Sequence, residues 1–177
     1  MIIITESILS MCAKRLFLIR HAKSSWKDAG LPDYARPLNK RGKRDAPLMA
    51  ELMKKKNVKP DLILTSFAER AKNTALIFAS ELEYMENKVK IDERLYEAMS
   101  KDILNVIQEI KSDIKVLLLF GHNPGLTTLH NFICDKFIGN IPTCGVTEYE
   151  YDGEWTDLSG EACRLISFDY PKKYLDE

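Results

Sequence analysis

Short, uninterrupted apolar runs separated by stretches of helical spacing constrain the fold of this chain more than any other feature. A run of this kind is typical of a strand that is buried on both faces, as in a mostly parallel sheet. The clearest runs lie at residues 16–19, 62–64 and 116–120, and weaker ones at 89–91, 146–151 and 165–168. We therefore predict a central sheet built from these six segments.

Between these runs, apolar and small residues recur three and four positions apart, which is the spacing of one helix face. This spacing predicts helices around residues 46–53, 71–78, 103–110 and 124–133. Ser66 and Glu69 have the spacing of a capping box at the start of the second helix. The alternation of strands and helices predicts an α/β fold, a three-layer α/β/α sandwich with a mostly parallel central sheet.

The length of 177 residues and the 45% share of hydrophobic residues match one globular domain with an ordinary core. We expect residues 1–13 to be an N-terminal extension outside the core and residues 14–177 to form the domain. Lys and Arg number 26, as do Asp and Glu, whereas nucleic-acid binders carry a basic excess. No apolar run approaches the roughly 20 residues that span a bilayer. Neither nucleic acid nor a membrane is an expected partner.

The four cysteines, Cys12, Cys134, Cys144 and Cys163, have no paired spacing that would predict a zinc site or a disulfide framework. We interpret them as reduced thiols, mostly in the core, and expect a cytoplasmic location. Cys144 lies in a predicted loop that could leave it exposed. The three histidines also lack ligand-type spacing, so no metal site is predicted.

Polar side chains follow the predicted strands at the edge where ligands bind in open α/β sheets. The first strand ends in Arg20-His21, and the longest is followed by His122-Asn123; Arg70 lies one turn into the helix after the second strand. Arginine presents a planar fork of donors that fits phosphoryl oxygens, and histidine can be a nucleophile near neutral pH. The pattern alone is consistent with a phosphate site and equally with solvated or structural residues.

Other phosphate chemistries lack their signatures in this sequence. No cysteine is followed six residues later by arginine, and there is no G-x-x-x-x-G-K-[ST] or G-x-G-x-x-G loop. No predicted strand ends in Asp-x-Asp. Histidine therefore remains as the nucleophile. We interpret His130, which shares a helix face with apolar residues, as a core histidine, and the basic run at 40–44 as a solvated helix start.

Residues 16–22, with the sequence LFLIRHA, resemble the signature strand and loop of the histidine phosphatase superfamily, the phosphoglycerate-mutase-like group. Later motifs follow in the family's order, namely Thr65-Ser66 with Arg70-Ala71 and Thr74-Ala75, then Leu95-x-Glu97, then Gly121-His122-Asn123. Within the superfamily, the stretches RHAKSSW at 20–26 and RPLNKRG at 36–42 resemble the SixA-type phosphohistidine phosphatase branch. Ala22 stands where most members have glycine, and Lys27 stands where the mutase branch typically has asparagine.

This resemblance implies a phosphoglycerate-mutase-like fold and a set of roles for the matching residues. It implies that His21 attacks phosphorus and carries a covalent phosphohistidine intermediate, and that Arg20, Arg70 and His122 hold the phosphoryl oxygens. Glu97 matches the proton donor to the leaving group. Ser24 and Asn123 are expected to be secondary phosphate contacts, and no cofactor is expected.

The expected function is that of a phosphatase acting on phosphohistidine in proteins. One helix and one strand fill the interval between Glu97 and His122, which leaves little for a lid and suits a phosphoryl group on a protein surface. The expected partner is accordingly a phosphorylated protein or a small phosphorylated metabolite. Two alternatives remain open: a phosphoester hydrolase or mutase that acts on a small metabolite, and a non-catalytic phosphate-binding module.

Overall fold

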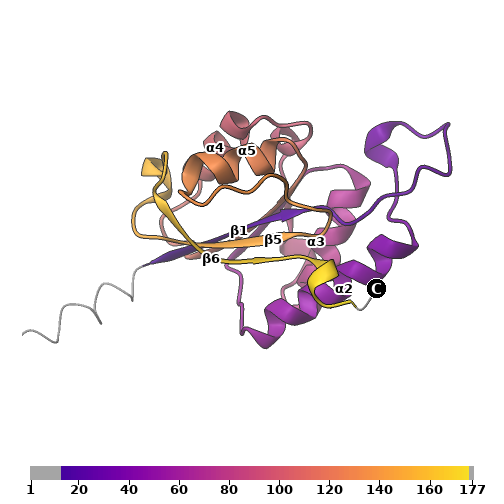
Figure 1. Cartoon of the computed structure of the whole chain (residues 1–177), viewed down its shortest axis with the longest axis horizontal. Coiled ribbons are helices and arrows are strands. Elements are labelled where there is room, and N and C mark those ends of the chain that lie inside the picture. The colour runs from indigo at the N-terminus through magenta and orange to yellow at the C-terminus, as the bar shows by residue number, and fades with distance from the viewer. Residues whose placement is uncertain (1–12, 176–177) are drawn as a thin grey trace, which may run out of the picture.

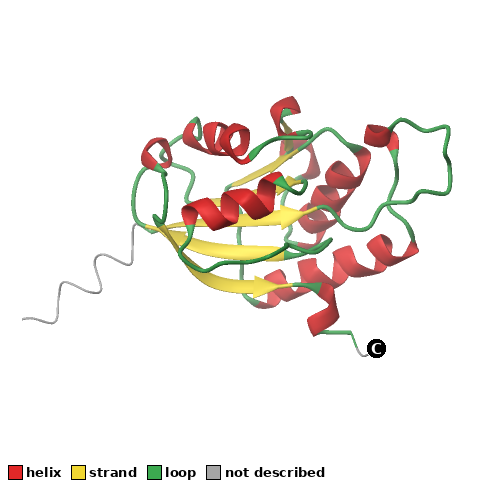
Figure 2. Ribbon diagram, turned by 45° about the horizontal axis from the view of Figure 1, so that its top comes forward, coloured by secondary structure: helices red, strands yellow, loops and turns green. Residues whose placement is uncertain are grey.

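The computed structural model describes residues 13–175, which form one six-stranded sheet with helices on both faces (Figures 1 and 2). The strands are β1 (Lys14–Arg20), β2 (Leu62–Thr65), β3 (Lys90–Ile91), β4 (Val116–Gly121), β5 (Val146–Tyr151) and β6 (Cys163–Asp169). Their order across the sheet is β3-β2-β4-β1-β5-β6. The first four are parallel to one another, while β5 and β6 run antiparallel to their neighbours. All six predicted strands are present, and the sheet is mostly parallel as predicted.

The strands bury side chains on both faces, which explains their continuous apolar runs. Leu16 and Leu18 of β1 belong to one buried cluster, whereas Phe17 and Ile19 belong to a second one on the opposite face. Helices α4 (Ser100–Gln108) and α5 (Gly125–Ile133) contribute to the first cluster, and α2 (Lys40–Lys55) and α3 (Glu69–Glu81) to the second. This arrangement confirms the predicted three-layer α/β/α sandwich.

Within residues 13–175, four short 3₁₀ helices lie in the connections between these elements and a fifth follows β6. They are η1 (Asp33–Ala35), η2 (Glu86–Lys88), η3 (Glu93–Leu95), η4 (Trp155–Asp157) and η5 (Pro171–Lys173).

Two sequence-based expectations about local structure are wrong. The capping box is not formed, because α3 has Ala68 as its N-cap and the Glu69 carboxylate contacts Lys72 and Asn73 instead. Cys144 is fully buried, although it lies in the loop before β5. Burial raises the pKa of its thiol well above the usual range.

Other expectations are confirmed within residues 13–175. Cys134 and Cys163 are free and buried, as expected of core thiols. His130 is fully buried, and its two ring nitrogens contact the Tyr149 hydroxyl and the Lys136 carbonyl at 2.6 Å each. His130 is therefore a structural core residue. The predicted extension at 1–13, which includes Cys12, lies almost entirely outside the described residues.

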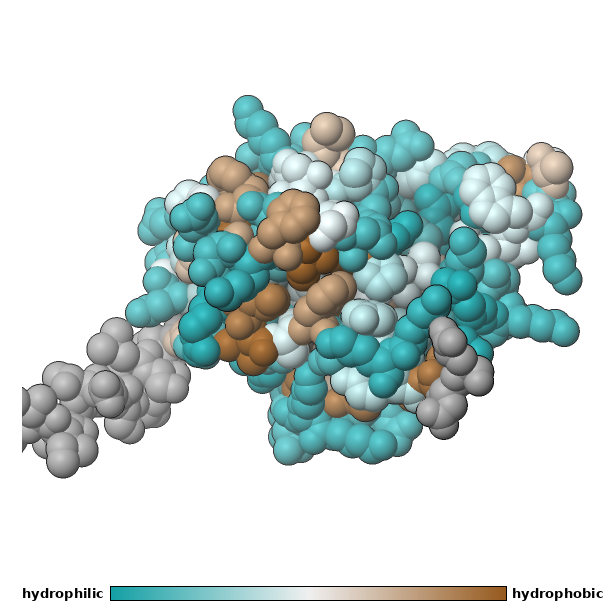
Figure 3. All heavy atoms as spheres, in the orientation of Figure 1, coloured by the Kyte–Doolittle hydropathy of each residue, from teal (hydrophilic) through white to brown (hydrophobic). Residues whose placement is uncertain are grey.

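A loop that the sequence patterns do not predict lies between β1 and α2. Residues 22–39, which include η1, project beyond the carboxyl end of β1, at the upper right of Figure 1. The two ends of the loop are joined at its base. The Ser25 amide donates to the Pro37 carbonyl at 2.8 Å, and Ser24 and Leu38 form an isolated antiparallel β-bridge. On the face shown in Figure 3, this projection carries weakly polar and apolar residues among hydrophilic ones.

No helix among the described residues has the length and apolar character required to cross a membrane. Within the same residues, no three His, Cys, Asp or Glu side chains are grouped as potential metal ligands.

Candidate active site

The two central parallel strands bring two histidines together. Arg20 of β1 is in register with Gly121 of β4, so His21 and His122 follow at equivalent positions on neighbouring strands. Because paired strands lie about 4.8 Å apart, side chains at such positions come into contact. The two imidazole ring centres are accordingly 5.1 Å apart, with their planes inclined by 52°. The predicted juxtaposition of these residues at one sheet edge is thus present.

His21 is held as a neutral imidazole with one free nitrogen. Its Nδ1 lies 2.8 Å from the carbonyl oxygen of Ala22. A carbonyl can only accept, so the proton of the neutral ring is on Nδ1 and the lone pair is on Nε2. Burial lowers the pKa of His21 to about 3. The hydrogen bond to Ala22 raises this pKa, whereas the nearby cations lower it further. At neutral pH the Nε2 atom therefore carries a free lone pair.

His122 is held by Ser66, at the end of β2. The Nε2 atom of His122 is 2.9 Å from the Ser66 hydroxyl, which accepts a hydrogen bond from the Ala68 amide at 3.3 Å. The hydroxyl hydrogen can therefore be donated to Nε2, which leaves the imidazole proton on Nδ1. Burial and the charge of Arg70 lower the pKa of His122 to about 4. His122 in this state is a neutral donor beside His21.

Arg20 and Arg70 supply positive charge from two directions. The Arg20 guanidinium donates to the Ile141 carbonyl at 2.8 Å, and burial lowers its pKa. Arg70, in the first turn of α3, is 6% exposed. Both cations lower the pKa of His21, so both lie within electrostatic reach of its imidazole. Two arginines around a neutral imidazole form a site for an anionic group such as phosphate.

Asp33, Arg36 and Tyr96 complete this cluster and were not among the predicted site residues. Arg70 donates to the Asp33 carbonyl at 2.6 Å and to its carboxylate at 2.7 Å. Arg36 donates to the same carboxylate at 2.6 Å, and the Tyr96 hydroxyl donates to it at 3.0 Å. Arg36 lies in the stretch at 36–42 that supports the family resemblance, but no periodic pattern distinguishes Asp33 from other acidic residues such as Asp28.

The remaining predicted residues occupy different positions around the site. The Ser24 hydroxyl is buried and accepts from Arg36 at 2.6 Å. The Asn123 amide group donates to the Asn140 side chain at 2.9 Å and to the Ile141 carbonyl at 3.0 Å. Glu97 is exposed and has a left-handed backbone, with φ of 51°.

Three side-chain polar atoms in the described part of the chain are buried without a hydrogen-bond partner, and all three belong to predicted site residues. They are Nε of Arg20, Nδ1 of His122 and Oδ1 of Asn123. A buried polar atom without a partner is destabilising, and such atoms in native proteins commonly serve a ligand. Two of the three are donors, as an anionic ligand requires.

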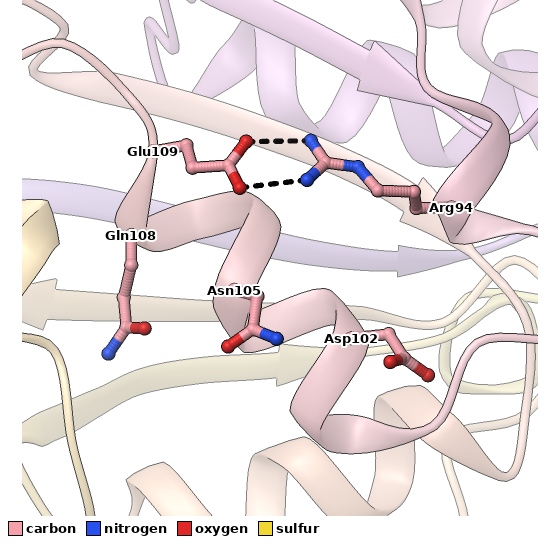
Figure 4. A pocket seen from close by; sticks show the side chains of 5 residues that line it. All are labelled: Arg94, Asp102, Asn105, Gln108 and Glu109. Carbon is pink, nitrogen blue, oxygen red and sulfur yellow. Dashed lines mark hydrogen bonds and ion pairs between the residues drawn. The ribbon is translucent and has the colours of Figure 1, made fainter.

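The hollow drawn in Figure 4 has a different character from this cluster. It measures about 480 Å³ and is lined by Arg94 and four polar residues of α4 and its end, none of them a predicted site residue. Arg94 and Glu109 form two hydrogen bonds of 2.8 Å across it (Figure 4). Both side chains are at least half exposed, so this is a surface ion pair.

Comparisons with known proteins agree with this geometry. A model of the histidine phosphatase superfamily (branch 1) matches residues 16–124. An uncharacterised chloroplastic protein of Arabidopsis thaliana is 34% identical over 160 residues, covering 84% of this chain and 73% of that protein. A 2,3-bisphosphoglycerate-dependent phosphoglycerate mutase of Bifidobacterium longum is 33% identical over 112 residues, 59% of this chain and 45% of the mutase.

A solved structure assigned as the phosphohistidine phosphatase SixA of Agrobacterium tumefaciens is similar along almost the whole fold. It has a TM-score of 0.74 and 28% identity, and the similarity covers 89% of this chain and 98% of that one. This neighbour belongs to the branch that the sequence resembles. Since the matched family model extends from β1 through His122, and so includes both histidines and both arginines, the chain belongs to the histidine phosphatase superfamily, branch 1.

Proposed function

We propose that this protein is a phosphatase that transfers a phosphoryl group to His21 and then to water. The observation that carries the proposal is the state of His21, whose Nδ1 is bonded to the Ala22 carbonyl and whose Nε2 is therefore a lone-pair nucleophile. Arg20, Arg70 and His122 surround it with donors and positive charge.

In the first step, Nε2 of His21 attacks phosphorus in line with the leaving group. A bond between Nε2 and phosphorus forms as the bond from phosphorus to the leaving atom breaks, and that atom keeps the electron pair. Arg20 and Arg70 offset the charge on the phosphoryl oxygens, and Nδ1–H of His122 donates a further hydrogen bond. Fixed donors of this kind need no reorganisation during the reaction.

In the second step, water attacks the phosphohistidine. The Nε2–phosphorus bond breaks, its electron pair returns to the imidazole, and inorganic phosphate leaves with the oxygen of water. The carboxyl of Glu97 is the candidate that gives a proton to an oxygen leaving group in the first step. In the second step, the protons of the attacking water leave with the phosphate. The arginine and histidine donors carry the charge, so the proposed reaction requires no metal ion or cofactor.

Phosphohistidine in a protein is the substrate class that we propose. In support, the interval between Glu97 and β4 contains α4 and its connections and no inserted domain. The solved structure of the Agrobacterium tumefaciens protein is assigned by name to the phosphohistidine phosphatase SixA, and the similarity covers 89% of this chain and 98% of that one. A partial match to a phosphoglycerate mutase makes hydrolysis or isomerisation of a small phosphoester the second candidate.

A rapid-quench experiment tests the proposal. The protein is mixed with a carrier protein that bears ³²P-labelled phosphohistidine, and the reaction is quenched. The label on the protein itself, and not on the carrier, is then assayed for the acid lability and base stability of phosphohistidine. We expect labelled wild-type protein, no label on His21→Ala, and unchanged labelling in the presence of EDTA. Turnover without label, or label retained by His21→Ala, would show that His21 is not the nucleophile. Faster release of phosphate from a sugar phosphate, or an isomeric product, would favour the second candidate.

A further inference from the structure

The Asp33 carboxylate is bound to the same arginine that is placed to bind phosphate. Arg70 donates to it from one side at 2.7 Å, Arg36 from another at 2.6 Å, and the Tyr96 hydroxyl at 3.0 Å. The Arg36 and Arg70 side chains are each 8% exposed, whereas the Asp33 side chain is 41% exposed. The carboxylate is thus fixed from inside the protein and still open toward solvent.

The position of Asp33 is set by a well-anchored segment. Arg36 is the central contact, because it also donates to the Ser25 carbonyl at 3.0 Å and to the Ser24 hydroxyl at 2.6 Å. These bonds tie η1 to the base of the 22–39 loop, immediately after His21. Asp33 therefore places a fixed negative charge beside Arg70, within electrostatic reach of His122, and does not move freely with the loop tip.

This carboxylate is unsuited to give a proton to the leaving group. Partial burial opposes its ionisation, but the hydrogen bonds from Arg70, Arg36 and Tyr96 lower the pKa of Asp33 to about 2. A carboxylate that is ionised throughout the physiological range has no proton to donate. Any effect of Asp33 on the reaction must therefore come from its charge. The same charge raises the pKa of His122, although burial and Arg70 lower that pKa by more.

A fixed anion in a cationic site discriminates among ligands by charge. The phosphoryl group is attracted by Arg20 and Arg70 and repelled by Asp33 to the same extent in every ligand. Ligands are therefore distinguished by their second charged group, which Asp33 repels when that group is negative. One unit charge about 12 Å away changes an affinity roughly tenfold at an effective dielectric constant near 20. A protonated nitrogen at the same place is attracted by the same amount.

We propose that Asp33 is a specificity-determining residue whose carboxylate favours phosphoryl groups carried on a protonated nitrogen and disfavours those carried on an anionic molecule. The inference rests on the proposed function, since it concerns the leaving group at the same site. The imidazolium of a protonated phosphohistidine meets this condition. When the bond from phosphorus to nitrogen breaks, the electron pair neutralises the ring and no proton has to be delivered. Asp33 therefore acts mainly on substrate binding.

The test compares Asp33→Asn with Asp28→Asn. The first substitution removes the charge and keeps an acceptor oxygen for one of the two arginines, which bind different oxygens of the carboxylate. The second removes one charge from the same loop at an exposed side chain that contacts Gly30 and not the arginines. We expect calorimetry to show that Asp33→Asn tightens the binding of 3-phosphoglycerate about tenfold more than the binding of inorganic phosphate, and that Asp28→Asn changes neither. Unchanged or weaker binding by Asp33→Asn would overturn the inference.

Hydrolysis gives the second readout. The ratio of kcat/KM for phosphohistidine to that for 3-phosphoglycerate should fall at least tenfold in Asp33→Asn, mainly through KM. Asp33→Glu keeps the charge and should retain most of the discrimination, and equal behaviour of the Glu and Asn variants would refute a charge effect. If the wild type hydrolyses neither compound but the binding shift is present, the proposed function fails and the charge selection by Asp33 stands.

Discussion

The imidazole of His21 is linked to the helix that carries Arg70 through a single threonine, Thr74. The Ala22 amide, next to the nucleophile, donates to the Thr74 hydroxyl at 3.0 Å. That hydroxyl in turn donates to the Arg70 carbonyl at 2.6 Å. Ala22, Thr74 and Arg70 are all buried, so the Thr74 side chain ties the backbone next to His21 to the first turn of α3.

We expect Thr74→Val to impair catalysis more than its effect on stability would suggest. The change keeps the shape of the side chain but leaves the buried Ala22 amide without its acceptor, which is destabilising by about 1–3 kcal/mol. Because the His21 loop is no longer held, kcat should fall by roughly tenfold or more, as expected for a small displacement of a reacting group. Denaturant unfolding and steady-state assays measure the two effects.

Thr147→Val is the matched control, since the Thr147 hydroxyl is also fully buried and donates to the Leu18 carbonyl at 3.2 Å within the sheet. It should lower stability and leave kcat unchanged. An equal loss of kcat in both variants would mean that Thr74 has no special role in positioning His21.

The histidines at the site should remain neutral well below pH 6. Burial raises the free energy of the imidazolium, so the pKa of His21 is lowered to about 3 and that of His122 to about 4, from an unfolded value near 6.5. NMR titration of the imidazole signals in the free protein should show both rings unprotonated at pH 5. A midpoint near 6.5 for either ring would contradict the buried neutral state.

The same shifts predict how stability depends on pH. Between about pH 6.5 and 4, the unfolded chain takes up protons on these histidines while the folded protein does not. The free energy of unfolding should therefore decrease as the pH falls through this window. His21→Asn removes one of the groups, so its urea midpoint should change less between pH 7 and pH 5 than that of the wild type.

The fold could be predicted from the sequence because a strand that is buried on both faces of the sheet must consist of consecutive apolar residues. Phe17 and Leu18 face opposite clusters and must both be apolar, which produces the continuous run of β1. The same logic extends to the site. His21 and His122 directly follow buried strands, and parallel strands deliver their ends to one edge.

The parts that could not be predicted depend on contacts between segments without periodicity. Asp33 and Tyr96 lie in or beside short 3₁₀ helices, where spacing carries no information about what a side chain faces. Ser66 has the spacing of a residue in a capping box, but its hydroxyl forms a hydrogen bond with the His122 ring instead. Cys144 is buried because its amide donates to the carbonyls of both Arg20 and His21, which draws the loop onto the site.

Arg70→Lys should lose most of the activity although the charge is retained. The guanidinium donates to Asp33 through two nitrogens while keeping further N–H groups for phosphate, whereas an ammonium is a single point of charge. We expect kcat/KM to fall by about a hundredfold, as for loss of one preorganised donor in a transition state. Arg94→Lys, at an exposed ion pair outside the site, should leave kcat/KM unchanged.

Glu97→Gln should separate phosphoester hydrolysis from phosphohistidine hydrolysis. An alkoxide leaving group needs a proton, so loss of the carboxyl should lower kcat for an alkyl phosphate by about 10²–10⁴-fold if Glu97 is the donor. The leaving nitrogen of a protonated phosphohistidine needs none, so kcat for that substrate should change less than threefold. Glu93→Gln, at a neighbouring exposed carboxylate, controls for the loss of charge. An equal decrease for both substrates would assign Glu97 a role in the hydrolysis of the phosphoenzyme, because that step is common to the two reactions.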